Sequence, residues 1–208
     1  KAIYSIEKFL MARRLMYWQA YLHKTSLVAE LILTRTLKRA KELTQKGTVL
    51  ACSEPLQFFL QNKVDFADFD AIILDKFAQL DDFDIVSALK AWQYHPDFIL
   101  SSLSKMIINR DLLKIKVSNE KFDKEEIKLY KHKLLEYYPI SLAETDYFVF
   151  KGKIKTLGYN KVIEPIQILK KDKTVEDVVE SSDQLNSRAF SKPVTKYYSC
   201  FPKVLIEK

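Results

Sequence analysis

The sequence is poor in the residues on which several architectures and sites depend. Three of its 208 residues are glycine, which disfavours glycine-rich phosphate loops and also β-sandwiches and barrels, whose turns use glycine. Two cysteines, Cys52 and Cys200, are too few for a disulfide framework or a zinc site, and they suit a reduced, cytoplasmic protein. No apolar run approaches the roughly 20 residues that cross a bilayer, so we expect no membrane partner.

Apolar and aromatic residues are abundant instead. They make up 48% of the chain, with 13 Phe and 11 Tyr, which is enough for one sizeable domain, or a large domain with a small appendage. The net charge of +7 suits anionic partners such as nucleotides, nucleic acid or acidic protein surfaces, although many soluble proteins carry a similar charge. The chain starts at Lys1, without an initiator Met or a signal peptide and almost directly in a helical pattern. We therefore interpret it as the C-terminal part of a longer protein.

Helical periodicity dominates the first two thirds of the chain. Residues 6–45 contain no Gly or Pro, and their apolar residues recur at helical spacing. This pattern predicts one very long helix, or two with a break near Thr25–Ser26, with Ser5 as N-cap and Gly47 as C-cap. A later helix is expected to have Asp84 as its N-cap. Shorter helices are predicted over residues 54–61, 70–79, 84–95, 97–110 and 124–137.

Strand-like patterns are concentrated near the end of the chain. Alternation around Gly152 predicts a hairpin, and Pro165 favours an edge position for a following strand. The expected elements are a strand over 112–117, a hairpin over 147–157, a strand over 161–169, a loop over 181–193 and a strand pair over 195–207. The predicted fold is therefore mainly α: a helical domain of residues 1–140, followed by a small β-rich (α+β) appendage of residues 141–208.

The stretch RRLMYWQAYLHKT, residues 13–25, has an unusual mixture of side chains. On a helical wheel at about 100° per residue, Arg13, Tyr17, Tyr21 and Lys24 lie within roughly 80° of one another. The helix is apolar in most other directions, which predicts a central, buried helix with one polar stripe. In one interpretation the polar ends simply reach solvent or backbone partners. In the other, Arg13 binds a phosphate, the tyrosines face a sugar or base, and Lys24 adds a charge.

This stripe contains no evident nucleophile or general base, so it is interpreted as a binding wall rather than a complete catalytic site. Other constellations are weaker. His23, His95 and His132 have no metal-ligand spacing, and His95 before Pro96 is interpreted as a helix-end residue. The acids of LDDFD, residues 80–84, suit a solvated loop and cap. The run KLYKHKLL, residues 128–135, forms a basic helical face without the exposed aromatic residues that would favour nucleic-acid binding.

Two segments resemble a known family. FLMARRLMYWQAYLHKT (residues 9–25) and DDFDIVSALKAWQYHPDFILSSLSKMIINRDLLKIKV (residues 81–117) are similar to HD-domain phosphohydrolases of the dNTP triphosphohydrolase (dGTPase-like) type. The first segment matches a long helix of these enzymes that follows the metal-binding core. The second ends in an Arg-x-Leu-[Phe/Leu]-Lys run, here residues 110–114. The matches cover most of residues 4–117, and the C-terminal tail matches only in general character.

The resemblance implies roles for individual residues. Arg13 would contact the substrate phosphate, Tyr17 would stand at an active-site His or Tyr position, and Tyr21 would pack under the deoxyribose. Leu22 departs from members that have a polar, base-reading residue there. A regulatory nucleotide between subunits would contact His23, Lys24, Arg110 and Lys114.

The larger departure is that the chain has no His-Asp dipeptide. The family binds its catalytic divalent metal through a His…His-Asp…Asp set, which is expected upstream of Lys1, so this chain is predicted to bind no metal and to be inactive alone. The resemblance implies that the full-length enzyme converts dNTPs to nucleoside and tripolyphosphate and forms a homo-oligomer. The alternative is a non-enzymatic helical module for oligomerisation or nucleic-acid binding.

Overall fold

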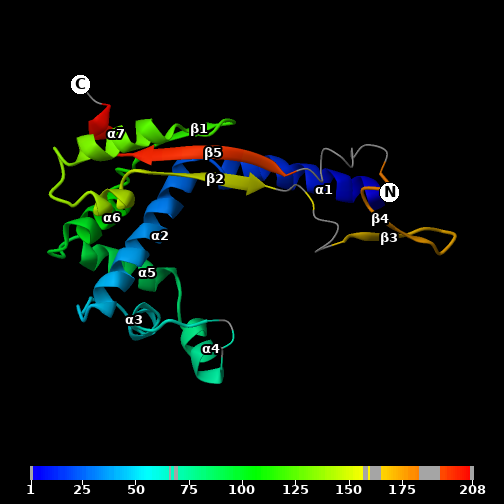
Figure 1. The fold of residues 1–208 in the computed structure, drawn as a ribbon. Helices are drawn as coiled ribbons and strands as arrows, with labels where there is room; N and C mark the ends of the chain where they lie inside the picture. Colours follow the sequence, from blue (N-terminus) through cyan, green and yellow to red (C-terminus); the bar gives the residue numbers. More distant parts are fainter. Residues whose placement is uncertain are drawn as a thin grey trace. The chain divides into compact units, whose positions relative to one another are not determined.

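The computed structural model describes residues 2–65, 67, 70–156, 159, 165–182 and 193–206 (Figure 1). Its longer helices are α1 (Ala2–Met16), α2 (Lys24–Gln45), α3 (Glu54–Gln61), α4 (Ala71–Ala78), α5 (Asp82–Trp92), α6 (Phe98–Ile108) and α7 (Lys124–Leu134). Short helices of other types are the π-helix η1 (Tyr17–Tyr21) and the 3-10 helices η3 (Ala143–Tyr147) and η4 (Lys203–Leu205). The strands are β1 (Lys114–Ser118), β2 (Phe150–Thr156), β3 (Gln167–Leu169), β4 (Val175–Asp177) and β5 (Val194–Phe201).

The described elements make an α+β fold, which the predicted mainly α class fits only loosely. The chain divides into two compact units that are each discontinuous in sequence. The first unit is Lys1–Leu27, Lys116–Phe122 and Lys151–Ser199; the second is Val28–Ile115, Asp123–Phe150 and Cys200–Lys208. This division differs from the predicted domains 1–140 and 141–208, which stay a prediction. Among the described residues, no helix is both long and apolar enough to span a bilayer.

The core of the second unit is built by helices. Ala40 of α2 packs with Leu56 and Leu60 of α3 and with Trp92 of α5, and all four side chains are buried. These apolar positions recur at the three- and four-residue intervals of one helix face, so each helix contributes a stripe to the shared core. A second aromatic group joins Phe98 of α6 to Tyr138 and Phe148, with ring centroids 5.0–6.3 Å apart.

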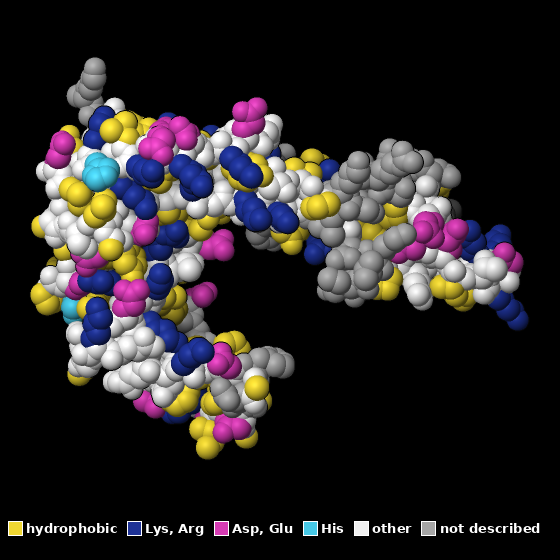
Figure 2. Space-filling view, viewed as in Figure 1, with side chains coloured by type: hydrophobic (Ala, Val, Ile, Leu, Met, Phe, Trp, Pro, Cys, Tyr) yellow, Lys and Arg dark blue, Asp and Glu magenta, His cyan; other side chains and the backbone are white. Residues whose placement is uncertain are grey.

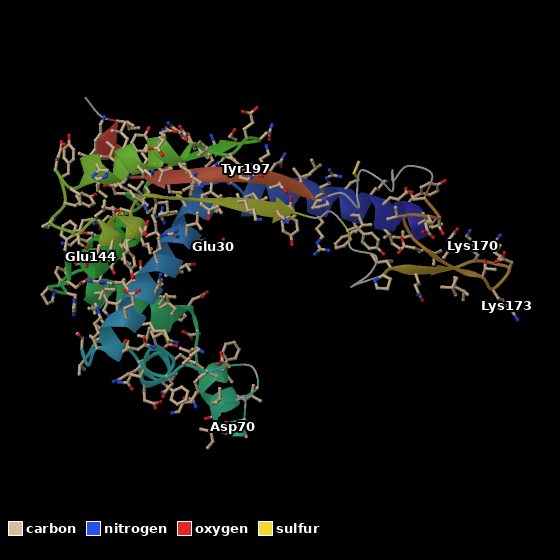
Figure 3. The ribbon with its side chains drawn as sticks, in the orientation of Figure 1. Glu30, Asp70, Glu144, Lys170, Lys173 and Tyr197 are labelled. Atoms are coloured by element: carbon tan, nitrogen blue, oxygen red, sulfur yellow. The ribbon has the colours of Figure 1, made fainter. Side chains whose placement is uncertain are left out.

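Capping residues explain where most of these helices begin. Asp70 accepts a hydrogen bond from the backbone N–H of Ile73, and Asp97 accepts one from Leu100. Figure 3 shows Asp70 at the start of α4. The predicted N-cap at Asp84 is wrong. Asp81 is the N-cap of α5 and Asp84 is its N3 residue, and together they form a capping box.

Gly47 ends α2 as predicted. Its φ is +90°, and the N–H groups of Gly47 and Thr48 donate to the carbonyls of Thr44 and Leu43. This pair of hydrogen bonds is a Schellman motif, which needs a left-handed residue after the helix. A side chain at position 47 would meet no atom within 4 Å, so any cost of substitution arises from the backbone conformation.

We therefore expect Gly47→Ala to lower the free energy of unfolding by about 1 kcal/mol. Gly47→Asn should cost less, because asparagine tolerates the left-handed region better than alanine does. Urea denaturation of the three proteins measures this order. Equal stability of the alanine and glycine proteins would show that the left-handed residue does not contribute as described.

The first unit places α1 against the segment that contains β3 and β4. Leu10 packs with Tyr159, Val178 and Val179, and all four side chains are buried. The phenol of Tyr159 donates to Asp177 and accepts from the N–H of Ile166, which ties this segment together. Strands β3 and β4 pair antiparallel, with Lys170 and Lys173 in the turn between them (Figure 3).

The predicted start and burial of the first helix are wrong. Ser5 lies inside α1, which begins at Ala2, and is not an N-cap. Glu7 of α1 is buried and accepts a hydrogen bond from Ser182. One face of α1 is covered, and its large apolar side chains in other directions are exposed: Tyr4, Phe9, Met11, Leu15 and Met16.

The three-stranded sheet has the order β1-β5-β2. Figure 1 shows β2 and β5 side by side and running in opposite directions. The strand predicted over 112–117 is confirmed as β1, shifted toward the C-terminus. The predicted hairpin around Gly152 is wrong, because β2 is one continuous strand. Gly152 serves a close approach instead of a turn: a Cβ there would overlap the phenol of Tyr198.

The remaining C-terminal predictions have mixed outcomes. Within residues 161–169, the strand is limited to β3, and residues 161–164 lie outside the described residues. The strand pair over 195–207 is wrong: β5 is a single strand, and the 3-10 helix η4 follows it after Pro202. Most of the loop predicted over 181–193 also lies outside the described residues.

Candidate functional site

The helical stretch that contains the predicted site changes type within that site. After α1 ends at Met16, residues Tyr17–Tyr21 form the π-helix η1, and the N–H of Leu22 donates to the carbonyl of Tyr17 at 2.7 Å. A five-residue hydrogen bond of this kind inserts an extra residue into the turn. Such π-bulges are rare and occur frequently at functional sites. This irregularity marks the segment as a candidate functional site.

The π-helix also corrects the predicted wheel. A wheel at about 100° per residue assumes an uninterrupted α-helix. Here a backbone hydrogen bond joins Leu22 to Tyr17, five residues earlier, and α2 begins only at Lys24. The predicted two helices are therefore confirmed, with the break at Leu22–His23 rather than at Thr25–Ser26. One straight stripe from Arg13 to Lys24 is not the geometry of this segment.

The structure brings Arg13 and Tyr17 together. The guanidinium carbon of Arg13 lies 5.7 Å from the centroid of the Tyr17 ring, within range of a cation–π interaction. Arg13 is exposed and Tyr17 is half-buried, so the expected buried stripe is wrong for these residues. An exposed guanidinium held beside a ring is accessible to an anion. The backbone of Tyr21 belongs to η1, and its side chain lies outside the described residues.

The four predicted regulatory residues divide between the two units. In the first unit, His23 and Lys24 are exposed, and Nδ1 of His23 accepts a 3.4 Å hydrogen bond from the N–H of Thr25 at the start of α2. In the second unit, Arg110 and Lys114 are exposed. Arg110 has a φ of 58° just beyond α6, in the left-handed region that favours glycine.

The described residues include no group of three or more His, Cys, Asp or Glu that could hold a metal ion. A catalytic metal set therefore does not fit the residues that the structure describes, and no metal-dependent step is assigned to them. The helix-end interpretation of His95 is confirmed, because its N–H donates to the carbonyl of Trp92 and its Nδ1 accepts from the N–H of Asp97.

An ion-pair network in the second unit has no counterpart in the sequence predictions. Arg39 of α2 binds both carboxylate oxygens of Asp97, at 3.1 Å and 2.6 Å, and also Glu144 at 3.2 Å. Figure 3 shows where Glu144 lies, at η3. Burial opposes ionisation of Asp97, but hydrogen bonds from Arg39 and Leu100 hold its pKa below the ordinary value. Hydrogen bonding to Asp97 raises the pKa of Arg39.

Sequence spacing carried no signal for this network, because its members are separated by 58 and 105 residues. The network has a structural role: Arg39 joins α2 to the start of α6 and to η3, and the carboxylates of Asp97 and Glu144 neutralise the charge of Arg39. Burial raises the pKa of the Tyr147 phenol, and the nearby Glu42 carboxylate raises this pKa further. The phenol therefore stays neutral at physiological pH.

The basic face predicted on α7 is partly neutralised. Lys128 pairs with Glu125 at 2.8 Å, and Lys131 pairs with Asp146. Figure 2 shows Lys and Arg side chains at many places on the visible face, interspersed with acidic and apolar side chains. This view therefore shows no continuous basic surface that would support the nucleic-acid-binding alternative.

Comparison with solved structures finds a match along almost the whole chain. A crystal structure of a phosphohydrolase from Bacteroides thetaiotaomicron VPI-5482 superposes with a TM-score of 0.85 and 45% sequence identity. The match covers 98% of this chain and 51% of that protein. The chain is similar to a phosphohydrolase. At this identity the likeness extends from the fold to the sequence along almost the whole chain.

A second similarity is shorter. The chain is 35% identical over 112 residues to YwfO, an uncharacterized protein of Bacillus subtilis (strain 168), which covers 53% of this chain and 24% of YwfO. No family model matches the sequence. The chain thus spans about half the length of the solved phosphohydrolase and about a quarter of the curated relative.

Proposed function

We propose that the chain is the C-terminal half of a metal-dependent HD-type phosphohydrolase that acts on deoxynucleoside triphosphates. The observation that carries this proposal is the 45% identity to a solved phosphohydrolase across 98% of the chain. The choice of dNTPs as substrates rests on the resemblance of residues 9–25 and 81–117 to the dNTP triphosphohydrolases. The proposed products are the nucleoside and tripolyphosphate.

In this proposal the segment around η1 forms one wall of the substrate site. Arg13 binds two oxygens of a phosphate through its planar guanidinium, and Tyr17 and Tyr21 contact the sugar. Two features support the assignment: the exposure of Arg13 beside the Tyr17 ring, and the π-helix at Tyr17–Tyr21. The apolar Leu22 gives no polar contact to a base, so this position is not proposed to select one.

A regulatory nucleotide is proposed to bind His23, Lys24, Arg110 and Lys114 in a homo-oligomer. The exposure of all four side chains supports this role, since a phosphate must reach them. The left-handed backbone of Arg110 adds a second argument. A non-glycine residue there is held by its surroundings at some energetic cost, and such positions are frequent at binding sites.

The divalent metal is proposed to be held by His and Asp residues upstream of Lys1. When bound, the metal would activate water for attack on a phosphate. The described residues of this chain supply no ligand set for it, so their role is to bind and orient the nucleotide. Catalysis then depends on the full-length protein.

We expect the proposed full-length protein to hydrolyse dNTPs with Mg²⁺, Mn²⁺ or Co²⁺, and the purified chain of residues 1–208 to be inactive under the same conditions. The phosphate species released from each dNTP measure the activity of both proteins. Chelation with EDTA is the control and should abolish the full-length activity. Metal-dependent hydrolysis by the chain alone would contradict the proposed division of roles, and an inactive full-length protein would contradict the proposed function.

A further inference from the structure

A cavity of about 310 Å³ lies within the second unit, distinct from the segment around η1. One wall is α2 and the other is formed by η3 and the first residue of β2. Its lining residues are Thr34, Arg35, Lys38, Asp146, Tyr147 and Phe150. This volume is at the small end of the range of ligand pockets, roughly 300 to 1,000 Å³, so a small ligand or one end of a larger ligand fits it.

Arg35 is held in a defined orientation at this cavity. Its guanidinium carbon lies 3.1 Å from the centroid of the buried Phe150 ring, and its Nη1 donates to the carbonyl of Leu31 at 3.2 Å. Stacking on a ring fixes the plane of a guanidinium, and all its N–H donors lie in that plane. The arginine is therefore ordered before any ligand arrives, which lowers the entropic cost of binding.

Lys38 supplies a second positive charge one helical turn further along α2. Its side chain is exposed, and its ammonium lies 6.0 Å from the centroid of the Tyr147 ring. Among the described residues, no carboxylate forms an ion pair with it, in contrast to Arg39 on the same helix. Residues three apart on a helix are neighbours, so Arg35 and Lys38 present their charges to one cavity.

The other titratable groups at the cavity do not cancel these charges. Asp146 is the one acid in the wall, and Lys131 of α7 pairs with it. Tyr147 stays neutral because burial raises its pKa. Cys200, which is close enough to Arg35 to interact electrostatically, is buried, and burial raises its pKa to about 12. At neutral pH the wall thus carries two cations and one carboxylate that is already paired.

We propose that this cavity binds a diphosphate group through Arg35 and Lys38. A planar guanidinium and a nearby ammonium are the donors that phosphate oxygens prefer, and the cavity has room for two phosphates. The diphosphate is either free pyrophosphate or the end of a nucleotide whose nucleoside extends into solvent. The inference does not depend on the proposed triphosphohydrolase function, because it uses residues outside the segment around η1.

Isothermal titration of the 208-residue chain with pyrophosphate, at constant ionic strength, tests the site. We expect saturable binding that Lys38→Ala weakens by about tenfold, equivalent to ~1.4 kcal/mol. Lys38→Arg should keep most of the affinity, because it keeps the charge. Arg35→Lys should weaken binding by a similar factor, since a lysine cannot stack and form two parallel hydrogen bonds. Circular dichroism of each variant verifies that it is folded.

Two control variants separate this site from other positive charges. Lys90→Ala removes an exposed lysine from α5, away from the cavity, and should leave the affinity unchanged. Lys105→Ala removes an exposed lysine from α6 that does not line the cavity, and it should also leave the affinity unchanged. A loss of binding in either control as large as that in Lys38→Ala would show a general effect of positive charge and overturn the cavity assignment.

A parallel titration with ADP identifies the source of the diphosphate. Equal affinity for ADP and pyrophosphate would show that the phosphates alone are recognised, whereas tighter ADP binding would indicate the end of a nucleotide. Either result supports the site if Lys38→Ala weakens the binding of both ligands. Absence of pyrophosphate and ADP binding at millimolar concentration, or equal binding by the wild-type and Lys38→Ala chains, would overturn the proposal.

Discussion

Replacing Arg13 by alanine is expected to reduce dNTP turnover by the proposed full-length protein about ten- to hundredfold, at about 1.4 kcal/mol per decade. The guanidinium is exposed beside the Tyr17 ring, where it can form two parallel hydrogen bonds to a phosphate. Arg13→Lys keeps the charge and loses this geometry, so it should already lower turnover. Removal of the Tyr21 hydroxyl in Tyr21→Phe should cost less than either.

Stability measurements separate this role from a purely structural one. An arginine that neutralises a buried acid would destabilise the fold when it is removed. Because Arg13 is exposed, its loss should remove only an exposed cation–π contact, worth about 0.5–1 kcal/mol. The melting temperature of Arg13→Ala should therefore stay close to that of the wild-type protein. Lys8→Ala, which removes an exposed charge from the same helix, is the matched control and should change neither quantity.

A marked fall in melting temperature with unchanged turnover per folded molecule would end the phosphate-binding assignment for Arg13. Turnover by Lys8→Ala that falls as far as that of Arg13→Ala would show a general effect of positive charge on α1. Both quantities should be measured on the same preparation, so that loss of folded protein is not counted as loss of activity.

Asp97→Ala is expected to destabilise the second unit by about 3 kcal/mol, which corresponds to a fall of roughly 6–12 °C in melting temperature. The substitution leaves the guanidinium of Arg39 without its bidentate partner in a site where their side chains are 12% and 15% exposed. It also removes the cap that accepts the N–H of Leu100. Asp97→Asn should cost less, because an amide oxygen can still cap the helix.

Lys128→Ala is the control for this prediction. It breaks an ion pair with Glu125 in which both side chains are largely exposed, so we expect little change in stability. Thermal unfolding followed by circular dichroism compares the variants. Similar melting temperatures for Asp97→Ala and Lys128→Ala would show that the Arg39 network does not stabilise the fold as its geometry implies.

The same network predicts the direction of acid unfolding. The folded-state pKa values of Asp97 and Glu144 are lowered, chiefly by hydrogen bonds that favour the charged carboxylates, against the effect of burial. Carboxylates with lowered pKa contribute stability above their unfolded-state pKa, about 4, and lose it as the pH falls through the folded-state value. Wild-type stability should therefore decrease below about pH 4, and Asp97→Ala should show a weaker dependence there.

Local signals in the sequence predict the helices well because each is encoded within a few residues. The helix over 54–61 follows from its apolar spacing, and the left-handed residue after α2 follows from Gly47. Ser5 misled the prediction because a serine is also tolerated within a helix. Asp84 misled it because the third residue of a capping box has the same side-chain chemistry as the cap itself.

The site was less predictable, for two physical reasons. A helical wheel assumes the same rotation for every residue, so it cannot predict the π-helix. The extra residue between Tyr17 and Leu22 arises from the backbone hydrogen bond that joins them. The cavity beside Arg35 depends on contact with Phe150, which is 115 residues away by numbering and has no local pattern that links the two. The assignment of Arg13 to the site stays a prediction from spacing and resemblance, and the structure adds the exposure of its side chain and its place beside Tyr17.

The most direct test of the central claim is ³¹P nuclear magnetic resonance of the proposed full-length protein incubated with a dNTP and Mn²⁺. The account predicts that the triphosphate signals of the nucleotide are replaced by those of free tripolyphosphate, while the chain of residues 1–208 leaves them unchanged. A full-length protein that leaves all four dNTPs intact, or that releases pyrophosphate and a nucleoside monophosphate instead, would contradict it.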